Sequence, residues 1–550
     1  MTNLLPTKNE RLRPWIILAI SWVVAFDIAW FFQRASGSHA NDFGANFRES
    51  THYVTGLALR DFVTLAPSET KARNFIERYA EHYPAVDSQI WPPTFHLLES
   101  AWMMVFGTSR TGMLMLMTTL AATTAALLCA ALVKDFGIGL AALGVVILLC
   151  LPIFRHSYEV LLAEPLAAIL LFAGSLSWSR FLDGGRPVDA FAFGILAGLG
   201  LLTDPSALAL LFQAPISALF THRKERLRQP AMWMGVAIPV LIAGTAHWLL
   251  SGGANWGQLI IASGSWQFTR EAIPFYLGQL GVGLGVLLLL FFVVGLSREV
   301  RESAAHSSKW SVLAFTLTLA IVVRATISET LDARHLIPLI PITVAFVIAG
   351  FEHLRKWLSR SVANSPTPGK VRWTASAVIL CLAAVGIAIA QLLNGTTFRN
   401  RWTGYAEGAN EILKSPMAGA IRVLVSSDAV GNGALTSELA MRDKRPRHVI
   451  RLSSTELLQN VNRRGGIRPR FSSSEELAAW FPRSGFTMVA VDHSIAELDR
   501  SEVHDQLVRA TEQHPEIFWP MAQVTVKRGS DENAGVLAFY GIRNPQNKGN

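Results

Sequence analysis

The chain has 550 residues, with 49 basic and 40 acidic side chains, a formal net charge of +9 and a hydrophobic fraction of 51%. Only 16% of its residues are charged, against about 25% in soluble domains. This composition excludes a disordered chain, a disulfide-stapled secreted module and a single soluble enzyme domain. Residues 1–393 contain 29 basic and 23 acidic residues, and residues 394–550 contain 20 and 17. The uneven charge predicts a polytopic α-helical membrane domain, 1–393, followed by a soluble domain, 394–550.

Long apolar runs dominate the first part of the chain. A membrane-spanning helix needs about 20 mostly apolar residues, and about eleven runs qualify or nearly qualify. In chain order they are 14–32, 113–133, 137–153, 161–181, 191–202, 207–220, 232–250, 275–296, 310–327, 335–351 and 373–393. The first is predicted to be a retained signal anchor. The short pair around Thr203-Asp204-Pro205 is either two short helices or one broken hairpin. Four glycines at 278–285 predict close helix packing.

Loop charge predicts the orientation of these spans. With a cytoplasmic N-terminus, 18 lysines and arginines fall on inside segments, and only Arg155, Arg270, Arg324 and Arg334 lie at short outside loops. Basic residues in short loops stay on the cytoplasmic side. An odd number of spans then places residues 394–550 outside, in the periplasm if the membrane is a bacterial inner membrane.

Two outer segments have their own predicted structure. The long first outer loop, 33–112, contains an apolar helix over 94–107, which we expect at the membrane interface. The second segment, 394–550, has strand character at 422–427, 448–452, 487–492, 523–527 and 536–542, and helical character at 435–442, 474–481 and 501–514. Such alternation indicates an extracytoplasmic α/β domain. Its Asp428-Ala-Val-Gly431 turn is interpreted as a plain helix entrance.

Short polar and aromatic motifs follow one another in a characteristic order. They are Glu49-Ser-Thr-His52-Tyr53, Trp91-Pro-Pro93, Phe106-Gly107, the outer carboxylate Glu164 and Arg334-His335-Leu-Ile-Pro338. This order resembles the GT-C superfamily of membrane glycosyltransferases. Within it, the chain is most similar to the bacterial relatives of protein O-mannosyltransferases and of lipid A aminoarabinose transferase. The resemblance covers roughly residues 10–350, and the C-terminal domain only in its position and class.

The resemblance implies an inverting glycosyltransferase that moves a sugar from a polyprenyl-phosphate donor to an acceptor at the outer face of the cytoplasmic membrane. It places Glu49 where the family has its catalytic acid. A phosphate leaving group needs no strong general acid, so one carboxylate base can suffice, unlike in glycosidases. The candidate carboxylates are Asp42, Glu49, Asp61, Asp87 and Glu164. Glu49 is favoured as the base, with Asp42 and Glu164 as further catalytic candidates.

The predicted substrate-binding residues carry donors suited to phosphate and sugar. They are His52, Tyr53, Arg155, His156, Arg334 and His335, with Arg155 and His156 expected in a short outer loop. Each has a structural alternative as a turn residue or an interfacial anchor. No cofactor and no metal cluster are predicted, although Asp42 and Glu49 could share a divalent cation. The expected partners are the donor, membrane lipids and a lipid, glycan or protein acceptor, and no nucleic acid.

A second hypothesis is a lipid-linked sugar transporter or flippase, or a membrane sensor whose outer domain binds a ligand. Transporters favour internal inverted repeats and charged or broken helices at the membrane midplane. The sequence has no visible repeat, and its carboxylates cluster at the outer ends of the spans. These features favour the enzyme.

The loop charges generate a topology prediction. A reporter fused after residue 393 is expected to be active only outside the cytoplasm. A cysteine introduced into residues 221–230, which contain four basic residues, is expected to be shielded from membrane-impermeant thiol reagents added outside. A C-terminal reporter active in the cytoplasm would contradict the predicted number of spans.

Overall fold

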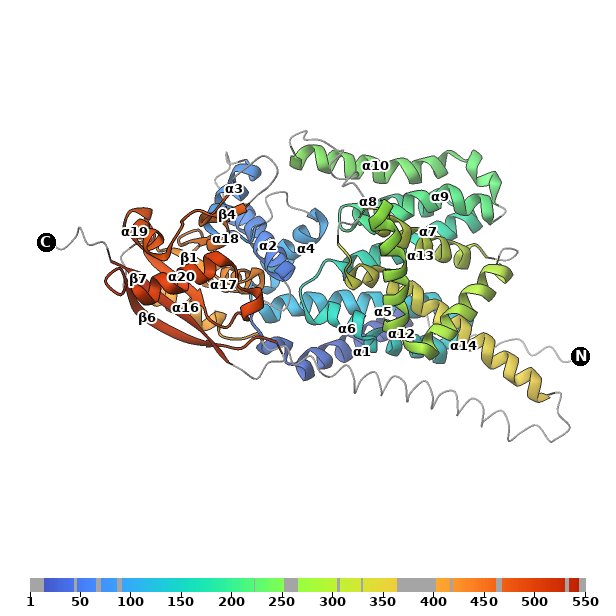
Figure 1. Cartoon of the computed structure of the whole chain (residues 1–550). Coiled ribbons are helices and arrows are strands. Elements are labelled where there is room, and N and C mark those ends of the chain that lie inside the picture. The colour runs from blue at the N-terminus through green and yellow to red at the C-terminus, as the bar shows by residue number, and fades with distance from the viewer. Residues whose placement is uncertain are drawn as a thin grey trace, which may run out of the picture. The chain divides into compact units, whose positions relative to one another are not determined.

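The computed structural model describes residues 14–543, apart from 44–46, 66–70, 87–91, 222, 252–265, 304–306, 328–329, 364–401, 416–418, 461–466 and 530–533. The described residues fall into two compact units. The first contains residues 14–33, 92–95 and 115–363, and the second contains 34–86, 96–114 and 402–543. Figure 1 labels most of the helices and some of the strands.

The first unit is helical. Its elements are α1 (Pro14–Ser36), α5 (Arg110–Cys150), α6 (Pro152–Glu159), α7 (Glu164–Gly184), α8 (Pro187–Leu201), α9 (Leu208–Phe220), α10 (Pro230–Ser251), α12 (Trp266–Ser303), α13 (Lys309–Ile327) and α14 (Ile340–Ala363), with the 3-10 helices η2 (Pro205–Ala207), η3 (Lys224–Arg228) and η4 (Ala333–Leu339). Helices α1 and α5 extend into residues of the second unit. Within the described residues, six helical segments are long and apolar enough to cross a membrane, and three shorter ones are apolar.

Ten of the eleven predicted apolar runs fall largely on these helices, and the run 373–393 lies outside the described residues. The runs 113–133 and 137–153 both lie mainly on α5, which is interrupted at Gly137, where φ is 79°. The short pair consists of two separate helices, α8 and α9, joined through Asp204 and η2. The total of about eleven spans stays a prediction.

Glycine positions show where helices of the first unit approach closely. The close packing predicted at 278–285 is wrong: a Cβ atom at Gly278 would meet nothing within 4 Å, and Gly285, with φ at 69°, interrupts α12. The close approach lies further along α12. A Cβ at Gly295 would be 1.9 Å from the Phe346 carbonyl oxygen, and one at Gly350 would be 1.8 Å from that of Phe291. Backbone contact thus fixes α12 against α14, the helix that follows η4.

The second unit contains a five-stranded sheet of order β2-β1-β5-β7-β6. Its strands are β1 (Arg422–Ser426), β2 (Val449–Leu452), β5 (Met488–Asp492), β6 (Phe518–Val526) and β7 (Gly535–Ile542). Strand β1 is parallel to β2 and β5, whereas β7 is antiparallel to β5 and β6. A separate hairpin pairs β3 (Leu458–Asn460) with β4 (Ile467–Pro469). All five predicted strands are present in the sheet.

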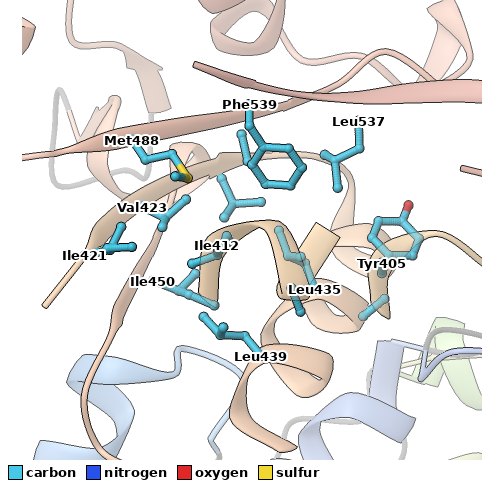
Figure 2. Close-up of a cluster of buried hydrophobic side chains, with 14 of the residues drawn as sticks. Tyr405, Ile412, Ile421, Val423, Leu435, Leu439, Ile450, Met488, Leu537 and Phe539 are labelled. Carbon is cyan, nitrogen blue, oxygen red and sulfur yellow. The ribbon is translucent and has the colours of Figure 1, made fainter. Parts of the chain in front are cut away.

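Helices cover both faces of this sheet. On one face, α16 (Tyr405–Lys414) and α17 (Ala429–Arg442) pack on side chains such as Val423 and Phe539. Figure 2 shows this core. On the other face, α19 (Ser474–Ser484) and α20 (Glu502–Gln513) pack on alternate residues of the same strands. This alternation of buried faces is what a two-sided sheet requires. The predicted α/β architecture and its three helices are confirmed for the described residues.

The first outer loop contributes α2 (Phe47–Leu65), α3 (Ala72–His82) and α4 (Pro93–Phe106). Only α4 was predicted. Helix α2 packs against α17. Asp61 on α2 accepts a hydrogen bond from Arg445 Nε at 2.6 Å, and the Tyr83 hydroxyl donates to Asp443 at 2.6 Å. Most of the loop therefore shares one unit with the C-terminal region. The predicted domain boundary at 393/394 lies outside the described residues and stays a prediction.

Candidate active site

The favoured base, Glu49, is held in a buried ion pair. It lies in the first turn of α2, where the helix dipole stabilises a negative charge, and it is 0% exposed. Arg110, at the start of α5, donates through Nη1 to Glu49 Oε1 at 2.8 Å. Arg110 also donates through Nε to the Ser38 carbonyl at 3.0 Å, and its guanidinium lies 5.0 Å from the Phe43 ring centroid. Hydrogen bonds on two sides and an aromatic face thus position the arginine that binds Glu49.

Asp42 is bound to the start of helix α16. Its Oδ2 accepts hydrogen bonds from the backbone N–H groups of Tyr405, at 2.9 Å, and Ala406, at 3.2 Å. Burial, with a smaller contribution from the nearby Glu438 charge, raises the pKa of Asp42 to about 7. The predicted catalytic candidate therefore satisfies two amides that the first turn of α16 leaves without helical partners. Whether Asp42 and Glu49 share a cation stays a hypothesis.

His52 and Tyr53 lie on the same helix as Glu49. Tyr53 is fully buried, its ring stacks on Phe43 at a centroid distance of 4.0 Å, and its hydroxyl donates to the Thr108 carbonyl at 2.7 Å. The His52 ring lies 5.2 Å from that of His96. Tyr53 therefore packs against the aromatic ring that also supports Arg110.

The sequence analysis did not assign His96 and Glu99 to the site. His96 lies beside His52, and Glu99 is bonded to His96. His96 and Glu99 are one helical turn apart on α4 and both are 0% exposed. His96 Nδ1 and Glu99 Oε2 are hydrogen-bonded at 2.9 Å, and burial raises the pKa of Glu99 well above its usual value. The signal in the sequence was the Glu99 carboxyl inside an otherwise apolar run.

The other candidate carboxylates have different outcomes. Asp61 is buried and accepts from the Tyr79 hydroxyl at 3.0 Å and from Arg445, so it ties loop helices to the C-terminal region. Asp87 lies outside the described residues. Glu164 is the first residue of α7, in the first unit.

Arg334 lies among acids in the first unit. Its side chain is 6% exposed, with Nε 2.6 Å from Asp332 Oδ2 and 3.7 Å from Glu164 Oε1. Asp332 also accepts the Arg334 backbone N–H at 3.0 Å and so begins η4. The Nη1 atom of Arg334 is buried and forms no hydrogen bond within the described part of the chain. Arg334 Nε and Arg110 Nη2 are likewise buried atoms for which the described residues provide no hydrogen bond of accepted geometry.

The remaining predicted phosphate partners are His335, which lies in η4, and Arg155 and His156, which lie on α6. His335 Nδ1 is hydrogen-bonded to the Tyr276 hydroxyl at 3.0 Å. Arg155 and His156 lie on α6, a short helix, which corrects the predicted loop; Pro152 at its first position is favourable for helix initiation. Arg155 donates to Glu159 at 2.8 Å and lies 4.7 Å from the Phe32 ring centroid. Burial lowers the pKa of His156, which favours its neutral form.

A second buried pair stabilises the same unit. Asp204, interpreted from sequence as a turn residue, caps Ser206 N at 2.7 Å and also accepts a hydrogen bond from Arg324. Arg324 Nε donates to the Ser206 hydroxyl at 2.7 Å. Both residues were visible as charges of opposite sign in or beside apolar runs. That complementarity was the signal for the pair.

A narrow apolar recess, too small to hold a water molecule, lies in the same unit. Its aliphatic lining consists of Leu151, Ile153, Leu280, Leu284, Leu336 and Ile340. Leu336 follows Arg334 and His335 directly in η4. Arg334 does not itself line the recess; it precedes Leu336 by two residues along η4.

The comparisons with known proteins agree with this architecture. Residues 91–249 match the family described as dolichyl-phosphate-mannose-protein mannosyltransferase. The fold is similar to ArnT from Cupriavidus metallidurans bound to undecaprenyl phosphate, with 14% identity over 94% of this chain and 98% of that chain and a TM-score of 0.58. It is also similar to the Archaeoglobus fulgidus oligosaccharyltransferase in its apo form, with 10% identity, 96% and 76% coverage and a TM-score of 0.57.

A third structure, the archaeal oligosaccharyltransferase AglB from Archaeoglobus fulgidus in complex with an inhibitory peptide and a dolichol-phosphate, has 10% identity, 94% and 76% coverage and a TM-score of 0.50. No curated protein sequence matches the chain. The family match and the folds confirm the predicted resemblance to GT-C membrane glycosyltransferases.

The burial of Asp42 generates a pH prediction. Its pKa is about 7 in the folded protein and about 3.9 in an unfolded chain. Between these values the folded state retains a proton that the unfolded state has lost, so the Asp42 contribution to stability falls as pH rises. Asp42→Asn removes this titration and keeps an acceptor oxygen. We expect the melting temperature of wild type, relative to Asp42→Asn, to decline from about pH 4 to about pH 7. A difference that is constant over this range would contradict it.

Proposed function

We propose that the protein is an inverting glycosyltransferase that moves a sugar from a polyprenyl-phosphate donor to an acceptor at the outer face of a bacterial cytoplasmic membrane. The observation that carries the proposal is the buried guanidinium of Arg334, whose Nη1 lacks a hydrogen-bond partner within the described residues, beside an apolar recess. A prenyl phosphate combines the two chemistries that such a place accepts, an aliphatic chain and an anionic oxygen. Undecaprenyl phosphate bound to ArnT and dolichol-phosphate bound to AglB support this donor class.

In the proposed reaction, an acceptor hydroxyl attacks the anomeric carbon of the donor sugar. The bond between that carbon and the phosphate oxygen breaks, and polyprenyl phosphate leaves with the electron pair. A carboxylate takes the hydroxyl proton. A single displacement of this kind inverts the anomeric configuration.

We assign the proton acceptor to Glu49. Asp42 already accepts two backbone hydrogen bonds at the start of α16, and both oxygens of Asp61 accept side-chain hydrogen bonds, Oδ1 from Arg60 and Oδ2 from Tyr79 and Arg445. The arginine bound to Glu49 is itself supported by Ser38 and Phe43. Glu164 stays the alternative base, because it lies beside Arg334.

Donor binding is tested at Arg334. Arg334→Ala removes the guanidinium, whereas Arg334→Lys keeps the charge but cannot form two parallel hydrogen bonds to phosphate. We expect the dissociation constant for polyprenyl phosphate, measured with the full chain in nanodiscs, to rise more for alanine than for lysine. Arg355→Ala on α14 removes an arginine that is ion-paired with Glu352 and serves as the control, with unchanged affinity. Equal affinity of wild type and Arg334→Ala would contradict the assignment.

The role of Glu49 as base is tested with variants that distinguish loss of the proton acceptor from loss of the Glu49–Arg110 ion pair. Glu49→Gln leaves the Arg110 charge without its partner, which costs about 3–5 kcal/mol of stability in buried pairs. The double variant Glu49→Gln with Arg110→Met removes both charges. We expect turnover of the double variant to stay about 10²–10⁴-fold below wild type, while Arg110→Met alone retains more activity. Wild-type turnover by the double variant would move the base to another residue and leave the transferase proposal intact.

The reaction class is tested with a radiolabelled prenyl-phosphate sugar and the reconstituted full chain. Transfer of the label to an acceptor, with release of prenyl phosphate, is the expected result. Movement of the label across the bilayer without transfer would instead establish the lipid-linked sugar transporter.

A further inference from the structure

A buried glutamate of the C-terminal sheet and its helices bonds to the segment that precedes the candidate base. We name the described residues of 402–543 the sheet domain. Glu438 lies on α17 between Leu435 and Leu439, two residues of the sheet core (Figure 2), and it is 2% exposed. Its Oε1 accepts a hydrogen bond from the Phe43 backbone N–H at 3.0 Å, across 395 residues of sequence. Phe43 precedes the start of α2 by four residues.

The Phe43 ring contacts the residues that hold Glu49. It stacks on the Tyr53 ring at a centroid distance of 4.0 Å, and the Arg110 guanidinium lies 5.0 Å from its centroid. Arg110 in turn donates to Glu49 at 2.8 Å. All of these residues belong to the second unit. Glu438 is therefore linked to Glu49 through two intermediates, Phe43 and Arg110.

The residues before Phe43 are also bound to the sheet domain. Asp42 N donates to the Trp402 carbonyl at 2.7 Å, and Trp402 N donates to the Asn41 side chain at 3.3 Å. Asp42 Oδ2 accepts from two amides at the start of α16. These bonds fix residues 41 and 42. The bond from Glu438 adds a constraint on Phe43 itself, whose ring touches the arginine that binds Glu49.

The sheet domain also holds α2 near its other end. Asp61 accepts from Arg445 Nε at 2.6 Å, and α17 packs against α2. Helix α2 is thus bound through Phe43 before its first turn and through Asp61 towards its end. A helix held near both ends cannot rotate freely about its axis, so the direction in which Glu49 projects is restricted as well.

Pairing within helix α17 does not by itself explain Glu438. Arg442, four residues later, forms an ion pair with Glu438, a spacing that also occurs in exposed pairs on helix surfaces. Exposed pairs contribute little, whereas Glu438 is buried. A buried carboxylate needs hydrogen bonds to compensate its desolvation. Arg442 binds one oxygen, and the Phe43 N–H binds the other.

We propose that Glu438 is a positioning residue for Glu49, and that the sheet domain orders the first turn of α2 so that the proton acceptor points correctly for catalysis. The role rests on the proposed function of Glu49 as proton acceptor. A shift of about 1 Å in a catalytic group costs about 10²-fold in rate. A small displacement of Phe43 and Arg110 is therefore enough to be measured.

Three variants separate the Phe43 hydrogen bond from the ion pair. Glu438→Ala removes both interactions. Glu438→Gln removes the charge that pairs with Arg442 and keeps an oxygen that accepts from the Phe43 N–H. Glu411→Ala is the control, because it removes a partly exposed carboxylate of α16 that pairs with Lys414 in the same unit.

Hydrogen–deuterium exchange of the full chain in nanodiscs measures the coupling without a substrate. The readout is the amides of residues 51–54, which in a helix donate to the carbonyls of the first turn of α2. For Glu438→Ala we expect these amides to exchange at least about tenfold faster than in wild type, with unchanged exchange in β1 and β5. Glu438→Gln and Glu411→Ala are expected to behave as wild type.

Two exchange results would overturn the proposal. One is unchanged exchange of residues 51–54 in Glu438→Ala. The other is faster exchange throughout the sheet domain, because that result would mean general loss of folding rather than loss of one hydrogen bond.

The catalytic consequence is measured with the radiolabelled prenyl-phosphate sugar, with kcat expressed per polyprenyl-phosphate binding site. We expect Glu438→Ala to lower kcat at least about tenfold while KM for the donor stays within about twofold. Glu438→Gln should recover most of kcat. If wild type transfers sugar and Glu438→Ala has the same kcat, the positioning role is wrong and the transferase proposal stands. If wild type transfers no sugar, the proposed function fails, and the exchange experiment still decides whether the sheet domain orders α2.

Discussion

A charge buried away from water costs several kcal/mol unless an opposite charge or a set of hydrogen bonds compensates it, and this constraint arranges both units. In the second unit it joins α2 to the start of α5 through Glu49 and Arg110, and it joins the loop helices to the C-terminal region through Asp61 and Arg445. In the first unit it joins Arg324 of α13 to Asp204 at the turn before η2. The apolar packing is non-directional, so these pairs supply the specific register.

Arg334 departs from this pattern in an informative way. It has two carboxylates within ion-pair distance, yet its buried Nε and Nη1 atoms form no hydrogen bond of accepted geometry within the described residues. This feature is the basis of the proposed donor site. Arg155, by comparison, donates through Nε to Glu159 and lies over the Phe32 ring.

The sequence predicted the features that depend on local composition and on the spacing of apolar residues along the chain. Ten apolar runs coincide largely with helices of the first unit. Strand and helix patterns located all five strands of the C-terminal sheet and three of its helices, because burial on two faces imposes these patterns locally. It did not predict α2 and α3, whose mixed polar and apolar residues become buried only against distant elements such as α17. Pairing partners were missed for the same reason: Glu49 and Arg110 are 61 residues apart. The glycines at 278–285 do not mark the close approach predicted for them, because close approach depends on which helix lies opposite. The close backbone contact lies instead at Gly295 and Gly350.

The central claim is that Arg334 contacts the phosphate of a prenyl-phosphate donor. The most direct measurement is an experimental structure of the full chain in lipid with polyprenyl phosphate bound. The account predicts phosphate density within hydrogen-bond distance of the Arg334 guanidinium and prenyl density along the recess lined by Leu280, Leu284 and Leu336. Phosphate bound elsewhere, with Arg334 still held only by Asp332 and Glu164, would contradict it.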